Sequence, residues 1–344
     1  MISIFVILFV LCLWGIRFSH FHEDYCDIVP TTAIKGIFVI IILASHLWGY
    51  IHLQPTFDNL LFCHILLGLG QSMVALYFFY SGYGICESLK CKEGYADRFF
   101  KNRFLKTLLH FDLAVLLFVI ASFFLKIDFF SQKPYTLSNY LFCWIGWKSV
   151  GDSNWFMFVI LALYLISFLA MKVRGGWMAA KILIPTVLLW VFLSFTHPED
   201  KWWYDTLATF PLGMLYSQLK PGIDRYLRKP YIWWMTFFGL TAAYFLAHHF
   251  LGIDKWGLVN CLFCLIVVLS TMKVRFGNPV LRWLGLNAFA IYILQRLPMN
   301  ILSGFGLNQK IAIFVPSAII ITFLLAEGFT RTTRLIDRKL FYAR

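Results

Sequence analysis

The chain has 344 residues, of which 60% are hydrophobic and 19% aromatic, and its mean hydropathy is +0.74. Soluble domains carry far fewer apolar residues, so this composition excludes a soluble globular protein and indicates a polytopic membrane protein. The formal net charge of +13 does not indicate a nucleic-acid partner. The Lys and Arg residues cluster in short loops between apolar runs, where positive charge orients a membrane protein.

The apolar runs predict the fold class, an all-α transmembrane bundle of about 10–11 spans of roughly 20 residues each. In chain order we expect spans at 2–17, 34–52, 66–86, 105–126, 154–172, 178–196, 203–219, 231–251, 256–272, 283–303 and 311–330. The stretch 126–153 combines three lysines with a short apolar patch, and it predicts a re-entrant or interfacial helix.

The first predicted span has neither a basic region before it nor a small-residue cleavage motif after it, so we expect it to be retained rather than removed as a secretory signal. Residues 1–31 are therefore predicted to form an extra N-terminal transmembrane helix with a short loop. Residues 32–344 are predicted to form a single membrane domain. No pattern in the sequence indicates an oligomeric state.

Every second connection between the predicted spans is basic. Lys and Arg are concentrated in 87–106, 172–181, 220–229, 273–282 and the C-terminal tail, and the alternate connections are poor in them. Positive residues favour the cytoplasmic side. The pattern predicts that the N-terminus lies outside and that the C-terminus lies in the cytoplasm.

Lys35 and His46 lie in the otherwise apolar stretch 34–51. Eleven residues at about 100° each bring His46 back to within roughly 20° of Lys35, about 16 Å further along the same helix face. Charged residues at mid-membrane cost roughly 2.5 to 3.5 kcal/mol, so such a pair indicates function. A neutral imidazole suits a general base. The alternative is a buried histidine that only hydrogen-bonds a neighbouring helix.

Two further elements follow in the next predicted span and its loop. The run LYFFYSGY ends with Ser81 and Gly82, where small residues also suit close helix packing. The loop after it ends RFFKNRFLK, with Arg103 and Lys106 three positions apart and expected on one helical face. These cations suit phosphate binding, although basic loops also serve as topology signals. The C-x-x-C at 261–264 has no second pair of ligands, so we expect no metal.

The order of these elements resembles the acyltransferase-3 family of integral-membrane acyltransferases, and most closely its branch similar to fucose 4-O-acetylases and polysaccharide O-acetyltransferases. The matching elements in order are KGI from Lys35, the histidine eleven residues later, the aromatic-SG run, R-x-x-K from Arg103, NWF at 154–156, FPLGMLYS at 210–217 and LGLNAFAIYILQ at 284–295. The resemblance covers about residues 32–327. Residues 32–344 would then form an acyltransferase-3-like membrane domain.

The resemblance implies catalytic roles for His46 and Lys35. It also implies that Lys35, Arg103 and Lys106 bind the donor. Lys35 and Lys106 stand where arginine is commoner in the family, which keeps the charge but not the bidentate geometry. Gln295 stands where many members have a histidine, and this change removes a proton carrier.

The resemblance thus implies an O-acyltransferase of the inner (cytoplasmic) membrane. It would move an acetyl group from cytoplasmic acetyl-CoA to a sugar hydroxyl of a lipid-linked or cell-surface glycan, with no metal. His46 would take the hydroxyl proton or carry the acyl group transiently. A competing interpretation is a proton-coupled transporter or flippase of a glycan or small molecule, but the two related halves typical of transporters are not visible in the sequence. A catalytically silent relative is a third interpretation, suggested by Gln295 and the two lysines.

Overall fold

The computed structural model describes residues 2–51, 59–63, 69, 71–129, 137–250 and 256–341. Within these ranges the chain is almost entirely helical, and its two strands, β1 (Arg17–Phe18) and β2 (Val274–Arg275), have two residues each. The predicted all-α class is confirmed.

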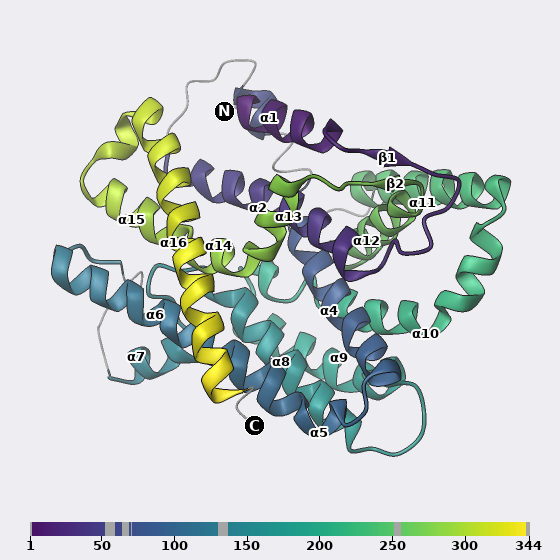
Figure 1. Cartoon of the computed structure of the whole chain (residues 1–344). Coiled ribbons are helices and arrows are strands. Elements are labelled where there is room, and N and C mark those ends of the chain that lie inside the picture. Colours follow the sequence, from purple (N-terminus) through teal and green to yellow (C-terminus); the bar gives the residue numbers. More distant parts are fainter. Residues whose placement is uncertain are drawn as a thin grey trace.

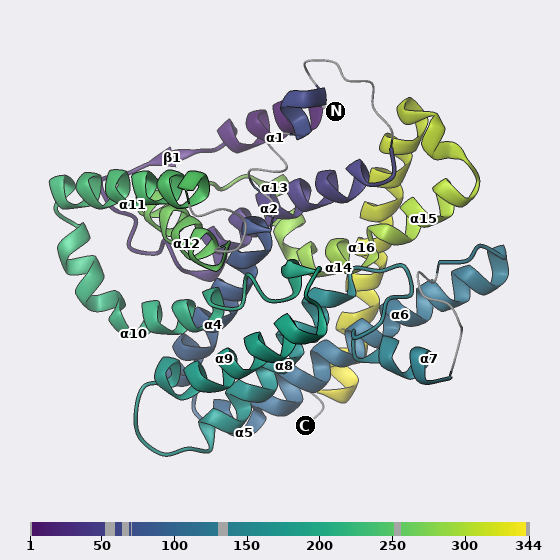
Figure 2. The same cartoon turned by 180° about the vertical axis from the view of Figure 1, so that it is seen from behind.

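The helices are shown along the chain in Figure 1 and from behind in Figure 2. In chain order they are α1 (Ile2–Leu13), α2 (Ile28–Trp48), α4 (Ser72–Cys91), α5 (Tyr95–Phe99), the π-helical segment η1 (Phe100–Leu105), α6 (Lys106–Leu125), α7 (Leu137–Trp144), α8 (Asn154–Met171), α9 (Met178–Thr196), the 3-10 helix η2 (Lys201–Trp203), α10 (Thr209–Leu227), α11 (Pro230–Phe250), α12 (Trp256–Lys273), α13 (Pro279–Leu286), α14 (Ala288–Leu294), α15 (Arg296–Gly304), the 3-10 helix η4 (Leu307–Gln309) and α16 (Ile311–Leu340).

Among the described residues, five helical segments are long and apolar enough to cross a membrane: α2, 95–125, α8, α9 and α16. They differ in how much of each is covered by protein. In the most apolar 18-residue window of α2, 67% of the residues are buried, against 22% in α9 and in α16. The ionisable residues on α2 therefore lie within the bundle rather than on a helix that faces lipid.

The predicted span 283–303 is wrong as a single helix, because the structure divides it into α13, α14 and α15. The first break is at the buried Asn287, whose side-chain amide donates to the carbonyl oxygen of Trp283 at 3.1 Å. The second break follows Leu294. Pro298 has no N–H to donate to the Leu294 carbonyl four residues earlier, so the helical hydrogen bonding is interrupted there. This second break leaves Gln295 between the two short helices and makes Arg296 the first residue of α15.

Other boundaries differ less. The first predicted span, 2–17, ends at Leu13, because the chain turns at Gly15, which has a φ of +74° that suits glycine, before entering β1. Helix α2 begins at Ile28, six residues before the predicted start at 34, and Pro30 lies in its first turn, where proline is tolerated. A short helix predicted within 126–153 is present as α7.

Two glycine pairs set the closest approaches between helices. A Cβ added at Gly213 of α10 would overlap the carbonyl oxygen of Phe79, and one at Gly82 of α4 would overlap that of Phe210. In the same way, a Cβ at Gly285 of α13 would overlap the Thr32 carbonyl oxygen on α2, and one at Gly36 of α2 would overlap the Leu281 carbonyl oxygen on α13. Backbone therefore packs directly on backbone at both crossings, as small residues allow between membrane helices. These crossings fix α2 and α4, which carry most of the residues considered below.

The segment between α1 and α2 packs on the basic loops. Strand β1 pairs antiparallel with β2, with Arg17 opposite Arg275. Arg275 also forms an ion pair with Asp24 at 2.7 Å, and Arg228 forms one with Glu23 at 2.6 Å. The chain that leads into α2, and with it the Lys35 end of that helix, therefore lies on the same side as the basic loops 220–229 and 273–282.

Candidate active site

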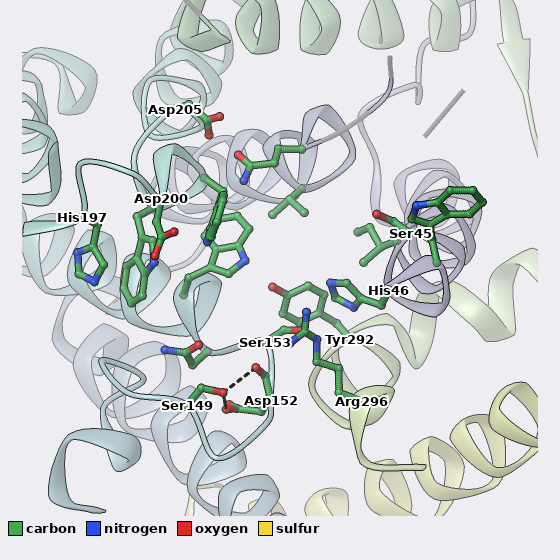
Figure 3. Close-up of a pocket in the computed structure, with 18 of the residues that line it drawn as sticks. Ser45, His46, Ser149, Asp152, Ser153, His197, Asp200, Asp205, Tyr292 and Arg296 are labelled. Carbon is green, nitrogen blue, oxygen red and sulfur yellow. Dashed lines mark hydrogen bonds between the residues drawn. The ribbon is translucent and has the colours of Figure 1, made fainter. Parts of the chain in front are cut away.

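The His46 side of the bundle contains a cavity of about 640 Å³, which we call the histidine cavity. Figure 3 shows that its walls come from α2, the loop before α8, the segment between α9 and α10, and the α14–α15 region. Its lining includes Ile42, Ser45, His46, Gln71, Val74, Trp147, Ser149, Asp152, Ser153, Asn154, Trp155, His197, Asp200, Trp202, Trp203, Asp205, Tyr292 and Arg296. The volume suits a small-molecule or sugar-sized ligand.

His46 points into this cavity beside Tyr292 (Figure 3). The centroids of the two rings are 6.3 Å apart. The Nδ1 atom of His46 is fully buried and has no hydrogen-bond partner among the described residues. No hydrogen bond to a residue that the structure describes therefore ties this nitrogen to a neighbouring helix.

Several other buried polar atoms around His46 also lack hydrogen-bond partners within the described chain. They are Tyr292 Oη, Gln295 Oε1, Arg296 Nε, Asp152 Oδ2 and Ser153 Oγ. Burying a polar atom without a partner costs roughly 1–3 kcal/mol, and functional sites are one place where such atoms persist. Their concentration around one histidine indicates a site built for a polar ligand.

Residues 145–153, called here the Asp152 loop, connect α7 to α8. Hydrogen bonds through Asn300 of α15 link this loop to α15 and to Tyr50, just after α2. Asn300 of α15 donates to the carbonyl oxygen of Gly151 at 3.0 Å and accepts from the hydroxyl of Tyr50 at 2.5 Å. Within the loop, Asp152 Oδ1 accepts from Ser149 Oγ at 2.9 Å and from the backbone N–H of Val150 at 3.1 Å. The loop thereby carries Asp152 and the first turn of α8 to the wall opposite His46.

Burial raises the pKa of the Asp152 carboxyl from 3.8 to about 6, although its hydrogen bonds act in the opposite direction. The folded protein therefore holds this proton more tightly than the unfolded chain does, and its free energy of unfolding should fall as pH rises from about 4 through 6. We expect Asp152→Asn to remove this fall, so that the variant gains on the order of 2 kcal/mol relative to wild type between pH 4 and pH 7.5. Unfolding in mixed micelles at both pH values measures the difference. Equal pH dependence of the two proteins would contradict it.

Aromatic side chains form the wall of the histidine cavity away from His46. His197 stacks on Trp203 with centroids 4.1 Å apart, and Trp147 packs edge-on to both rings. Asp200 lies beside this cluster (Figure 3). This wall therefore offers flat apolar surfaces next to a hydrogen-bond acceptor.

A second cavity, of about 830 Å³, lies at the other end of α2 and is called here the lysine cavity. Its lining includes Lys35, Tyr77, Tyr80, Ser81, Glu87, Lys92, Arg103, Phe156, Tyr164 and Phe289. Lys35 Nζ lies 5.9 Å from the centroid of the Tyr80 ring. Arg103 Nε donates to Tyr95 Oη at 3.3 Å. Among the described residues neither cation forms an ion pair with a carboxylate, so both charges are available to an anionic ligand.

Ile42, Val74 and Tyr292 line both cavities. On α2, Lys35, Ile42 and His46 are spaced seven and four residues apart, which places them on one stripe of the helix. Phe156 packs edge-on to Tyr292, with ring centroids 5.1 Å apart, and its ring centroid lies 4.8 Å from that of Phe78. The two cavities therefore follow one another along α2 and meet at a mostly apolar junction beside His46.

The structure separates Arg103 from Lys106. Arg103 lies in η1 and lines the lysine cavity, whereas Lys106 pairs with Asp337 Oδ2 of α16 at 2.6 Å and does not line that cavity. In the wider turns of a π-helix, residues three apart lie further from one helical face than they do in an α-helix. The expectation that both cations share a face therefore differs from the structure, which brings together Lys35 and Arg103.

The structure also adds residues that the sequence did not single out. Tyr292, Arg296 and Asp152 all line the histidine cavity. Arg296 could have been predicted from the sequence, because an ionisable residue inside a predicted span, here 283–303, indicates a functional site. Asp152 could not have been predicted in this way, because an aspartate in a polar loop is common and does not by itself indicate a functional site. Gln295 is fully buried next to His46, and its amide donates to the carbonyl oxygen of Tyr292 at 3.1 Å.

A family model described as an acyltransferase domain, that of the acyltransferase-3 family, matches residues 32–329. Comparisons with curated proteins and with solved structures gave no match. The matched region begins on α2 just before Lys35 and ends in α16. It includes Lys35, Arg103, His46 and the other cavity-lining residues named above. The chain therefore belongs to the acyltransferase-3 family of membrane acyltransferases.

Proposed function

We propose that this acyltransferase moves an acetyl group from acetyl-CoA, bound from the cytoplasm in the lysine cavity, to a sugar hydroxyl in the histidine cavity. The acceptor would be a lipid-linked or cell-surface glycan, in keeping with the predicted fucose 4-O-acetylase-like branch. The observation that carries the proposal is the junction at Tyr292. There a cavity with two cations that form no ion pair with a described carboxylate meets a cavity with a histidine whose buried Nδ1 has no hydrogen-bond partner among the described residues.

Donor binding is supported by the charge of the lysine cavity. Coenzyme A is polyanionic, and its phosphates would find Lys35 and Arg103 without competing carboxylate partners among the described residues. Arginine binds phosphate through its planar fork and lysine binds it as a point charge. The basic loops around this end of the bundle would place the cavity on the cytoplasmic face. The narrow acyl-bearing arm would then extend toward the Tyr292 junction.

Acceptor binding is supported by the wall of the histidine cavity. A sugar ring has apolar C–H faces and a rim of hydroxyl groups. The faces of Trp203 and its neighbours would pack on the ring, while the carboxylates of Asp200 and Asp205 and the amide of Asn154 would hydrogen-bond the rim. A hydroxyl positioned near Tyr292 would then lie within reach of His46.

In the proposed reaction, His46 acts as the general base. It takes the proton of the acceptor hydroxyl as the oxygen attacks the thioester carbonyl carbon, and it returns that proton to the departing thiolate. The second route predicted above, in which the imidazole itself carries the acyl group, uses the same position of His46. Labelled protein would accumulate in the absence of acceptor only by this second route.

The test is transfer of radiolabel from acetyl-CoA to a glycan fraction in membranes that contain or lack the chain. Mass spectrometry of surface glycans from the same cells identifies the acetylated sugar. We expect label in the glycan only where the chain is present. Movement of a glycan across the membrane without a covalent product would contradict the proposal and favour the transporter interpretation.

Arg103→Gln is expected to raise the KM for acetyl-CoA about 10- to 100-fold, because it removes a charged hydrogen-bond donor to the nucleotide phosphates. The kcat should change little, since Arg103 lies outside the histidine cavity. Steady-state rates at varied donor concentration measure both constants.

Two controls make this result specific. Lys101 is exposed in the same π-helical segment and lines neither cavity, so Lys101→Gln should leave the KM within about twofold of wild type. With acetylpantetheine, which lacks the nucleotide, Arg103→Gln and wild type should show equal KM values. A KM that rises equally for both donors would refute phosphate binding by Arg103. Lys106→Gln tests the predicted donor role of Lys106 in the same assay, and its pairing with Asp337 leads us to expect a smaller change than for Arg103.

A further inference from the structure

Arg296 is a partly buried cation with no ion pair or hydrogen bond to any residue that the structure describes. It lines the histidine cavity, and its Nε is fully buried without a partner. Leaving a guanidinium partly buried and unpaired is costly, because its charge loses water and gains nothing in return. The arrangement therefore indicates that the partner of Arg296 is an anion that occupies the cavity.

The fold aims Arg296 at the space beside His46. Helix α14 ends at Leu294, and Arg296 is the first residue of α15, so its side chain leaves the helix at the end that borders the histidine cavity. Figure 3 shows its guanidinium pointing up to the gap between Tyr292 and His46. Arg296 is close enough to act electrostatically on both residues.

Asp152 lines the same cavity and lies close enough to Arg296 to interact with its charge, but the two side chains form no ion pair. Its Oδ1 accepts hydrogen bonds from Ser149 and from the Val150 backbone N–H, its Oδ2 has no partner, and no ion pair joins it to Arg296. Across the cavity, Ser153 begins α8 without a side-chain cap, and its hydroxyl is also unpartnered. The free N–H groups of that helix end add partial positive charge to the same region.

We infer that Arg296, together with the hydroxyl of Tyr292, binds the oxyanion that forms on the acyl group during transfer. The inference rests on the proposed function and deepens it. Tyr292 lies where the two cavities meet, so its hydroxyl is placed at the point where the thioester carbonyl would arrive. Arg296 lies on the histidine-cavity side of the same point and reaches the same carbonyl oxygen.

The acceptor oxygen forms a bond to the thioester carbonyl carbon, its proton passes to His46, and the carbonyl π electrons move onto the carbonyl oxygen. Arg296 and Tyr292 each donate a hydrogen bond to that oxyanion and keep their protons. When the oxyanion re-forms the carbonyl, the carbon–sulfur bond breaks and the thiolate takes the proton from His46. At the intermediate, the guanidinium of Arg296 and the imidazolium of His46 lie beside one oxyanion, and opposite charges at close range stabilise one another.

Three variants test the role by separating kcat from KM. Removing one oxyanion donor typically lowers kcat by about 100- to 1,000-fold. We expect Arg296→Gln and Tyr292→Phe each to show a loss of this size, with the KM for the glycan acceptor and the KM for acetyl-CoA within about threefold of wild type. Arg296→Lys, which keeps the charge but not the fork, should retain more activity than Arg296→Gln. Lys310→Gln, which changes an exposed cation just after η4, is the matched control and should match wild type.

The other outcomes assign Arg296 differently. If Arg296→Gln raises the KM for the acceptor and leaves kcat unchanged, the arginine binds an acidic group of the acceptor, and the oxyanion role is refuted. Unchanged kinetics would refute it as well. Acetyl-CoA binding and thermal unfolding, measured for each variant, identify loss of fold, and Tyr292→Phe, which keeps the ring, carries the test if Arg296→Gln unfolds. Absence of transfer by the wild type would contradict the proposed function itself, whereas the outcomes above concern Arg296 alone.

Discussion

Replacement of His46 by alanine should lower the kcat of acyl transfer by about 100- to 10,000-fold, the range that a general base contributes. The residual rate would come from the bound geometry and the oxyanion donors. Donor binding should remain intact, because the cations proposed to bind the donor lie in the lysine cavity. Initial rates of label transfer in membranes, measured beside equilibrium binding of CoA, separate the two effects.

The matched control for His46 is a histidine outside both cavities. His249 is exposed at the end of α11, and His249→Ala should leave kcat within about twofold of wild type. Transfer at the wild-type rate in His46→Ala would end the assignment of His46 as base. It would leave the cavities without an identified proton acceptor at their junction.

The second large effect concerns stability. Gly213→Ala should lower the free energy of unfolding by about 3 kcal/mol or more, because the added methyl group overlaps the backbone of Phe79 and the two helices must separate to admit it. No side-chain rotation relieves an overlap with backbone. Since α4 also carries Ser81 and Tyr80, which line the lysine cavity, the same shift should weaken donor binding. Unfolding in mixed micelles and CoA binding measure the two consequences.

Gly222 supplies the control within the same helix. It also lies in α10, and a Cβ added there meets nothing within 4 Å. Gly222→Ala should therefore be neutral or stabilising by up to about 1 kcal/mol, since alanine favours a helix over glycine. Equal losses in the two variants would show that helix α10 tolerates no alanine for reasons unrelated to the crossing.

The sequence predicted the α2 arrangement because a regular helix has a fixed period. The spacing of Lys35 and His46 placed both on one stripe, and the structure has Lys35, Ile42 and His46 facing cavities along that stripe. Gly82 allows close packing between helices, as its small size suggested. Ser81 instead lines the lysine cavity, and its hydroxyl shares a hydrogen bond of 3.0 Å with the hydroxyl of Tyr164. Each of these results needed only helical geometry and residue size.

The sequence failed where helices depart from regularity. Hydropathy described 283–303 as one span, but the structure divides it at a buried asparagine and again before a proline, and Arg296 begins the last of the three helices. The π-helical turns of 100–105 moved Lys106 away from Arg103 for a related reason. Irregular turns depend on hydrogen bonds to neighbouring helices, and these are not visible in the apolar pattern of a single segment.

Gln295 connects the family comparison with the site. It lies beside His46 at the position where the resemblance drawn from the sequence leads us to expect a histidine, and its Oε1 is buried without a hydrogen-bond partner among the described residues. An amide can orient an imidazole by a hydrogen bond but cannot exchange a proton with it. In the proposed reaction, His46 therefore accepts and returns the proton without a second histidine.

The junction of Ile42, Val74 and Tyr292 has a consequence for the cell as well as for the reaction. If the lysine cavity opens to the cytoplasm and the histidine cavity to the opposite face, these side chains and the adjoining ring of Phe156 form part of the partition between the two aqueous compartments. Hydrocarbon and aromatic surfaces hold no continuous file of water, so ions and protons should be held back while a short acyl group on a slender thioester arm can pass. The partition would thus preserve the electrochemical gradient of the bilayer during every turnover.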